Sequence, residues 1–405
     1  MLKQISSYIK IRGIFPLIMA VILSSMFLGP LSFLSWMYQH ALMICLLAYC
    51  TKLNKVKVGW AEVGLIMACC VSIVFGNPLP IFNSWMRLGL FCIALIITTP
   101  LISSPATEQF RVRLFNWVSL ICVFVGVGSF FAYFLGINYM RLNYGVTAVT
   151  MGGSFGGLTV QSMMLGPLAS LGMLRCVHIV IQRYVCGIKS SYYLYAAMFA
   201  CFASVLMASS RGAAGAALVA LCILVYEKLR HKMGKLIKIA LCLGCLAVPL
   251  APAVEYFSSG LVAKQEANME GGGTFNSREE LWNARLDEFK ESPLFGIGFS
   301  SQRKHISEFT RLTGTIEPGT SYGAVFAMTG LLGGSLFLYI LGGSLIKTKK
   351  QPMSLPQIYL IFFAIHLIVE GYVFAGGNPL CFIFWLCIGA VCAIKHNHQL
   401  NQLIV

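Results

Sequence analysis

Long apolar runs, separated by short polar connections, make up most of this chain. An α-helix needs about 20 apolar residues to cross the hydrocarbon core of a bilayer, because lipid offers no partner to free backbone groups. Roughly twelve stretches approach that length. They are residues 14–34, 36–50, 58–76, 85–102, 114–136, 156–175, 191–208, 212–226, 239–255, 321–345, 355–374 and 378–394. The pattern predicts an all-α polytopic protein embedded in a lipid bilayer.

One long polar segment, residues 256–320, interrupts this pattern. The chain is 58% hydrophobic and 11% charged, yet nine of its fourteen acidic residues lie in that segment. They are Glu266, Glu270, Glu279, Glu280, Asp287, Glu288, Glu291, Glu308 and Glu317. We therefore expect residues 1–255 to form a membrane bundle of nine spans and 256–320 to form a catalytic loop. Residues 321–405 would add three spans and a cytoplasmic tail.

The formal charge of +16 would suggest nucleic acid as a partner of a soluble protein, but the positions of the basic residues indicate otherwise. If alternate connections are cytoplasmic, they contain twenty of the thirty lysines and arginines. This bias follows the positive-inside rule. It predicts an inner-membrane protein with both termini in the cytoplasm, its long loop in the periplasm, and no nucleic-acid partner. The N-terminal apolar run is longer than that of a cleavable signal peptide.

The fifteen cysteines lie in or beside the predicted spans or on the cytoplasmic side. The long loop has none, so no disulfide framework is expected. Cys242 and Cys245 form a CxxC pair inside an apolar stretch, without a second pair of ligands. A role as small hydrophobic residues fits that setting better than zinc binding. We expect no metal and no cofactor.

Short connections on the predicted outer side carry isolated arginines. Arg211 opens a helix rich in small residues, whose N-terminus offers free N–H groups and a positive dipole end. With the guanidinium added, this arrangement favours a phosphate site at the membrane surface. The alternative is an interfacial arginine that reaches the lipid headgroups. Arg141 lies in a similar outer segment that is rich in glycine, and it is a further candidate for substrate binding.

A helix over residues 278–291 is predicted in the long loop. Ser277 and Glu280 have the spacing of a capping box, and Pro293 follows the end of the helix. One stripe of this helix combines two arginines with two aromatic residues, namely Arg278, Trp282, Arg285 and Phe289. Such a stripe suits a pyrophosphate beside sugar rings. The alternative is an amphipathic helix whose aromatic residues pack on the bundle and whose arginines pair with acids of the loop.

Four segments in order resemble the O-antigen ligase and Wzy-type polymerase superfamily. They are residues 155–172, the Ser-Arg-Gly of 210–212, the SREELW…EF…SPLFGIGF of 277–299, and the EPGTSYGAVFAMTGLLGG of 317–334. Each motif is weak alone, but four in register are specific. The resemblance covers about 155–334 and agrees with the twelve-span topology.

This resemblance implies a metal-independent, inverting membrane glycosyltransferase with a GT-C-like helical fold. Such enzymes take a glycan from undecaprenyl pyrophosphate, and either pass it to lipid A-core (ligases) or to another lipid-linked repeat unit (polymerases). It implies that Arg211 and Arg278 hold the pyrophosphate, with Arg141 as a third candidate. Ser321 and Tyr322, where the chain returns to the membrane, become candidates for substrate contact. A chain-length regulator is a candidate partner.

One departure from the family pattern bears on the acceptor. Ligases typically carry a His-Asn pair where the loop returns to the membrane, and this chain has Gly319-Thr320-Ser321-Tyr322 there. The missing histidine favours a polymerase in surface polysaccharide biosynthesis over a lipopolysaccharide ligase. Glu317, just before this point, is the candidate general base. A transporter of lipid-linked oligosaccharide or solute, and a non-catalytic assembly subunit, are the alternatives from other classes.

Overall fold

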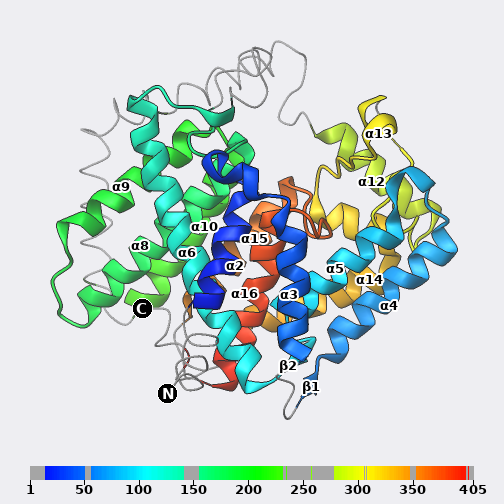
Figure 1. Ribbon diagram of the computed structural model, residues 1–405, viewed down its shortest axis with the longest axis horizontal. Coiled ribbons are helices and arrows are strands. Elements are labelled where there is room, and N and C mark those ends of the chain that lie inside the picture. Colours follow the sequence, from blue (N-terminus) through cyan, green and yellow to red (C-terminus); the bar gives the residue numbers. More distant parts are fainter. Residues whose placement is uncertain are drawn as a thin grey trace.

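A computed structural model describes residues 14–50, 56–140, 155–230, 278–304, 306, 308–346 and 353–397, together with residues 234, 257 and 400. In this part of the chain, α-helices form a bundle (Figure 1). The helices and 3-10 turns are α2 (Ile14–Ser25), η1 (Gly29–Leu34), α3 (Met37–Cys50), α4 (Trp60–Gly76), η2 (Pro80–Phe82), α5 (Ser84–Thr98), α6 (Pro105–Phe134), α8 (Ser162–Val185), α9 (Tyr192–Met207), α10 (Arg211–Leu229), α12 (Glu279–Glu291), α13 (Glu308–Thr313), α14 (Ser321–Leu345), α15 (Leu355–Val369) and α16 (Pro379–His396). The chain is an all-α polytopic membrane protein.

Eleven of the predicted spans coincide with helices, and the twelfth, 239–255, lies outside the described residues. Six of the described helices are long and apolar enough to cross a bilayer, and five more are apolar but shorter. Some boundaries shifted, as at α6, which begins at Pro105 because Ser104 and Thr107 form a capping box there. The predicted start of the span at 114 was therefore nine residues late.

Helix α16 is the centre of the bundle. It lies among α5, α6, α14 and α15, and nearly all of its side chains are buried, including the whole of Phe384 and Trp385 (Figure 1). The antiparallel pair β1 (Lys57–Val58) and β2 (Ile102–Ser103) joins the ends of α4 and α5. This pair lies at the opposite end of the bundle from α12 and α13 (Figure 1).

Two arginines counted as cytoplasmic loop residues in the topology prediction are buried in the bundle instead. Arg111 is fully buried, and its guanidinium donates to the carbonyl oxygens of Ile97 at the end of α5 (3.0 Å) and of Ile102 in β2 (2.6 Å). Arg175 of α8 donates to Asn116 Oδ1 of α6 at 2.9 Å. Carbonyl oxygens at a helix end have no intrahelical partner, so Arg111 satisfies one at the end of α5, while Arg175 links α8 to α6.

Helix α14 is broken at Gly330, roughly 14 Å from its outer end at 1.5 Å per residue. Gly330 has φ +63° and ψ −163°, a conformation that is essentially limited to glycine. The backbone groups released by the break bond to the segment that follows α12. Leu331 N donates to Pro293 O at 2.7 Å, and Ile297 N donates to Ala327 O at 2.9 Å. The loop thus supplies the hydrogen bonds that lipid cannot.

Candidate functional site

Helix α12 begins at Glu279, one residue after the predicted start. Arg278 occupies the N-cap position and makes no side-chain cap, and the predicted cap residue Ser277 lies outside the described residues. The arginine and aromatic stripe of α12 faces the membrane bundle. Phe289 contacts Phe326 of α14 edge to face, with ring centroids 6.0 Å apart. The stripe is thus turned toward the point where the chain returns to the membrane.

Arg278 lies at the junction of α12, α14 and α15. Its Nη2 donates to Glu370 Oε1 at 2.7 Å, and its Nη1 donates to the carbonyl oxygens of Val369 and Gly319. The indole N–H of Trp282 donates to the same Gly319 oxygen at 3.3 Å. The guanidinium is a quarter exposed, so it is fixed in position and still reaches the surface. We call Arg278 and Glu370 the junction pair.

The start of α14 is fixed to the end of α15 by hydroxyl groups. Ser321 Oγ donates to Glu370 O at 2.6 Å and accepts from the N–H of Tyr372 at 3.1 Å. Tyr322 OH donates to Ala364 O at 2.9 Å. Ser321 is fully buried and Tyr322 is partly buried. Both therefore shape the junction, and Ser321 also lines the cavity described below.

Arg211 begins α10 beside this junction. A Cβ added at Gly212 would meet Val369 of α15, whose carbonyl oxygen accepts from Arg278. It would also come within 3.8 Å of Cδ2 of His366. Arg211 is exposed at the first position of its helix. The fold therefore brings the starts of α10 and α12 to the same end of α15, which the sequence alone did not establish.

His366 is a buried imidazole at this junction. Its Nδ1 lies 2.8 Å from Tyr372 OH, and its ring stacks on Phe362 with centroids 5.3 Å apart. Nε2 has no hydrogen-bond partner among the described residues. The side chain is 1% exposed, so it contributes to the interior of the junction and does not face solvent.

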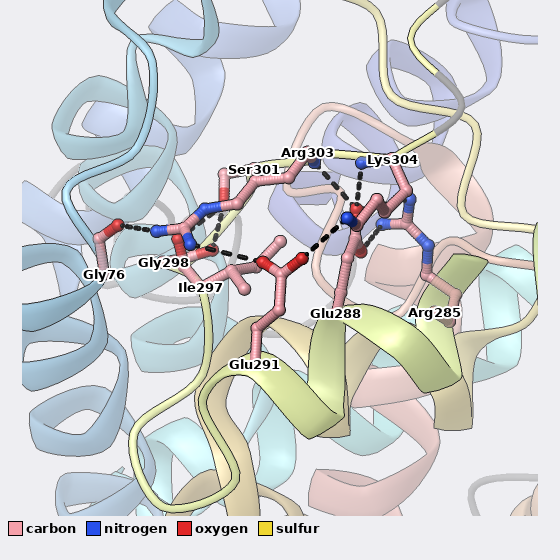
Figure 2. Close-up of polar contacts among 9 residues, drawn as sticks. All are labelled: Gly76, Arg285, Glu288, Glu291, Ile297, Gly298, Ser301, Arg303 and Lys304. Atoms are coloured by element: carbon pink, nitrogen blue, oxygen red, sulfur yellow. Dashed lines mark hydrogen bonds and ion pairs between the residues drawn. The ribbon is translucent and has the colours of Figure 1, made fainter.

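An ion-pair cluster holds the long loop to the bundle (Figure 2). Arg285 Nη1 lies 2.8 Å from Glu288 Oε2, and both side chains are almost completely buried. Glu288 Oε1 also accepts from the backbone N–H groups of Arg303 and Lys304, each at 2.7 Å. The guanidinium of Arg303 reaches Gly76 O at the end of α4 at 2.5 Å. We call this set the loop clamp.

Electrostatics of the loop clamp follow from its burial. Burial raises the pKa of Glu288, against the opposing effects of Arg285 and the two backbone N–H groups. Burial likewise lowers the pKa of Arg285. The hydrogen bond and ion pair with Lys304 lower the pKa of the exposed Glu291. Arg285 is thus engaged inside the protein, and its guanidinium does not reach a surface where a substrate binds.

A cavity of about 620 Å³ adjoins the junction. The residues at its wall come from the starts of α5, α8, α14 and α16, from the loop before α14, from residues 371–377 and from Met26. Those that carry polar side chains are Arg87, Gln161, Ser300, Thr315, Ser321 and Asn378. Pro318 and Gly371 also line it, and they lie next in sequence to Glu317 and Glu370. The backbone that carries Glu317 and Glu370 therefore passes beside the cavity, although neither side chain is part of its wall.

Of the other predicted residues, Glu317 is exposed on the loop and is not part of the cavity wall. Arg141 lies outside the described residues. Among the residues that the structure does describe, no three His, Cys, Asp or Glu side chains lie together in an arrangement able to hold a metal ion.

Glu370 and Arg87 are the two charged residues that the sequence did not single out for the site. Glu370 directly follows a predicted span, and its position in the sequence does not indicate a partner. Arg87 lies more than 200 residues before its partners in the loop. Only the tertiary structure brings it to Gly314, whose carbonyl oxygen accepts from Arg87 Nη2 at 2.7 Å.

The fold and site define a polytopic membrane protein with a rigid, charged loop held over one end of its bundle. Residues 196–338 match the family model described as O-Antigen ligase, so this part of the chain is similar to that family. The matched region runs from α9 through α14 and includes Arg211, Arg278 and Ser321. A search of curated proteins found no match.

Proposed function

We propose that this protein is an inverting, metal-independent glycosyltransferase with a GT-C-like fold, and that it polymerises oligosaccharide repeat units carried on undecaprenyl pyrophosphate. The observation that carries the proposal is the junction pair, in which Glu370 fixes the partly exposed guanidinium of Arg278 beside the start of α10. Arg211 at the start of α10 and Arg278 at the start of α12 lie at the same end of α15. A doubly charged pyrophosphate is the anion that such a pair binds most strongly.

The reaction we propose has three parts. An acceptor hydroxyl attacks the anomeric carbon of the donor sugar, the bond from that carbon to the phosphate oxygen breaks, and undecaprenyl pyrophosphate leaves. Arg278 and Arg211 stabilise the charge that develops on the leaving phosphate. Glu317 accepts the proton of the acceptor hydroxyl.

Glu370 is assigned a positioning role and not the role of base. Its carboxylate lies 2.7 Å from Arg278 Nη2, so its charge is committed to that guanidinium. Glu317 is exposed and lies next to Pro318 of the cavity wall, which leaves it available to an acceptor. The proposal treats Arg285 and Trp282 as the support of α12, and Tyr322 as the support of α14.

The Glu317 assignment is tested by Glu317→Gln beside Glu308→Gln, an exposed loop acid away from the cavity. Loss of a general base typically costs about 10²–10⁴-fold in rate. We expect that loss for Glu317→Gln in a transfer assay with purified protein, and near wild-type rates for Glu308→Gln. A wild-type rate for Glu317→Gln would exclude it as the base and move the assignment to another group.

The choice between polymerase and ligase rests on the Gly319–Tyr322 segment, which lacks the His-Asn pair of ligases. It is tested by the glycan ladder of a deletion strain carrying Arg211→Ala or the wild-type gene. A polymerase predicts loss of long polymer, with one repeat unit still attached to lipid A-core. Bare core with polymer left on the carrier would instead identify a ligase. A full ladder from Arg211→Ala would exclude the pyrophosphate assignment.

The proposal includes a membrane topology. The loop clamp and the junction would face the periplasm, both termini would face the cytoplasm, and residues 256–320 would form the catalytic loop between the two parts of the bundle. A chain-length regulator remains a candidate partner. The β1–β2 pair lies at the end of the bundle opposite α12, as this topology requires (Figure 1).

A further inference from the structure

Two hollows adjoin at the outer end of the bundle. The cavity of about 620 Å³ beside the junction is followed by a second of about 340 Å³. Met26, Leu90, Gly376 and Gly377 line both of them, so the two share a wall. Volumes of about 300–1,000 Å³ are typical of sites that enclose small organic ligands. Together the hollows extend away from the junction pair, and we call them the groove.

The described lining of the groove carries positive charge only. Its described lining includes one charged side chain, Arg87, and no acid. Arg87 Nη1 donates to Ser300 Oγ at 3.3 Å and Nη2 to Gly314 O at 2.7 Å. These bonds use two of the five N–H groups of a guanidinium and fix its plane. The positive dipole ends of α5, α8, α14 and α16 add to its field, because these helices begin at the same cavity.

The second hollow has a different character. Trp36, Gln39 and His40 line it at the start of α3, and Trp36 is 66% exposed. The rings of Trp36 and His40 meet edge to face with centroids 5.7 Å apart, and Trp36 remains largely exposed beside this contact. An exposed aromatic face beside amide and imidazole groups suits a sugar ring, which combines an apolar face with a rim of hydroxyls.

We propose that the groove binds the acceptor glycan, and that this acceptor is an acidic oligosaccharide. Arg87 binds its carboxylate or phosphate substituent, and Trp36 stacks on a neighbouring sugar. This inference rests on the proposed function, because it takes the junction pair as the donor side. Ser321 joins the two sides, since it lines the cavity and its Oγ donates to Glu370 O. An acceptor held in the groove thus reaches the donor over a short path.

The test is equilibrium binding of soluble probes to the full-length protein in nanodiscs. The probes are a trisaccharide that contains glucuronic acid and the same trisaccharide with glucose in its place. We expect wild type to bind the acidic probe at least 10-fold more tightly. Arg87→Met should remove this preference and leave binding of the neutral probe in place. Trp36→Ala should weaken binding of both probes several-fold. Equal binding of the two probes by wild type would overturn the acidic class.

Matched controls separate the groove from general effects on the bundle. Trp85 precedes Arg87 by two residues and is 58% exposed, but it does not line either hollow. Arg311 of α13 is an exposed arginine that is not in the groove. Trp85→Ala and Arg311→Met should bind both probes as wild type does. If they lose binding as Trp36→Ala and Arg87→Met do, the groove is not the site. Thermal unfolding of each variant checks that Arg87→Met remains folded.

Failure of this inference differs from failure of the proposed function. If wild type binds the acidic probe in the groove but transfers no glycan from a lipid pyrophosphate donor, the proposed function fails and the groove assignment stands. If transfer occurs and the KM for acceptor is unchanged in Arg87→Met and Trp36→Ala, the groove assignment fails and the proposed function stands. A carboxylate probe and a phosphate-substituted probe, compared directly, identify which anionic group Arg87 binds.

Discussion

Single residues of this protein divide into those that hold the loop and those that remain available to substrate. Arg285 and Glu288 belong to the first kind, because they neutralise each other almost without contact with water. Arg278 belongs to the second, because a quarter of it is exposed although three acceptors fix its position. The sequence placed both arginines on one stripe of α12. The sequence did not distinguish the two arginines, because helical periodicity indicates which face of the helix a side chain lies on but not how deeply it is buried.

At the residue scale, Glu288→Gln should destabilise the loop clamp strongly. The change leaves the buried charge of Arg285 without its partner, and breaking a buried ion pair in this way typically costs about 3–5 kcal/mol. We expect faster hydrogen exchange at the amides of Arg303 and Lys304, which donate to Glu288. Glu279→Gln, which alters an exposed acid of the same helix outside the clamp, should change exchange little. Equal effects of the two changes would contradict the assignment.

The pH dependence of the clamp follows from Glu291. Its folded-state pKa is lowered, with the hydrogen bond from Lys304 as the largest cause. Its contribution is therefore fully present above the ordinary carboxyl value of 4.5 and is lost as pH falls through the lower folded-state value. Exchange at the Arg303 amide, measured against pH, should show this acid limb in wild type. The limb should be reduced in Glu291→Gln, and its persistence there would assign it to another group.

At the scale of elements, the segment after α12, residues 292–299, packs against both α4 and the break in α14. Phe295 stacks on Phe75 of α4 with centroids 5.0 Å apart, and the segment bonds to the break in α14. Gly296 has φ +77°, and a Cβ there would overlap the backbone of Met328. The SPLFGIGF motif is thereby explained by close backbone approach and positive φ, apart from any contact with substrate.

Gly330→Ala should prevent the segment after α12 from packing against the break in α14. The φ of +63° with ψ near 180° excludes an L side chain, and the new Cβ would overlap the carbonyl of Leu294. We expect little folded protein on size-exclusion chromatography in detergent. Gly342→Ala is the matched control, because a Cβ at that position of the same helix meets nothing within 4 Å. Normal folding of Gly330→Ala would show that the break is not required.

At the scale of the whole molecule, apolar run length predicted eleven described helices and their order. The membrane imposes that signal, since every spanning segment must satisfy its own backbone. Contacts between segments that are far apart in the sequence produce no comparable pattern of apolar residues. The meeting of Arg87 with Gly314, and of Gly212 with Val369, depends on how helices pack and not on periodicity. Glu370 was not assigned to the site for the same reason, because its partner Arg278 lies 92 residues away.

The measurement that tests the central claim most directly is glycan transfer in proteoliposomes, with purified protein and a defined undecaprenyl-pyrophosphate-linked repeat unit. Wild type should form polymer, and it should do so equally in EDTA. Arg278→Ala should lose about 10²–10³-fold in rate, the usual cost of removing a group that stabilises developing charge. Arg311→Ala, an exposed loop arginine away from the junction, should keep the wild-type rate. Polymer formation by Arg278→Ala at the wild-type rate would contradict the account.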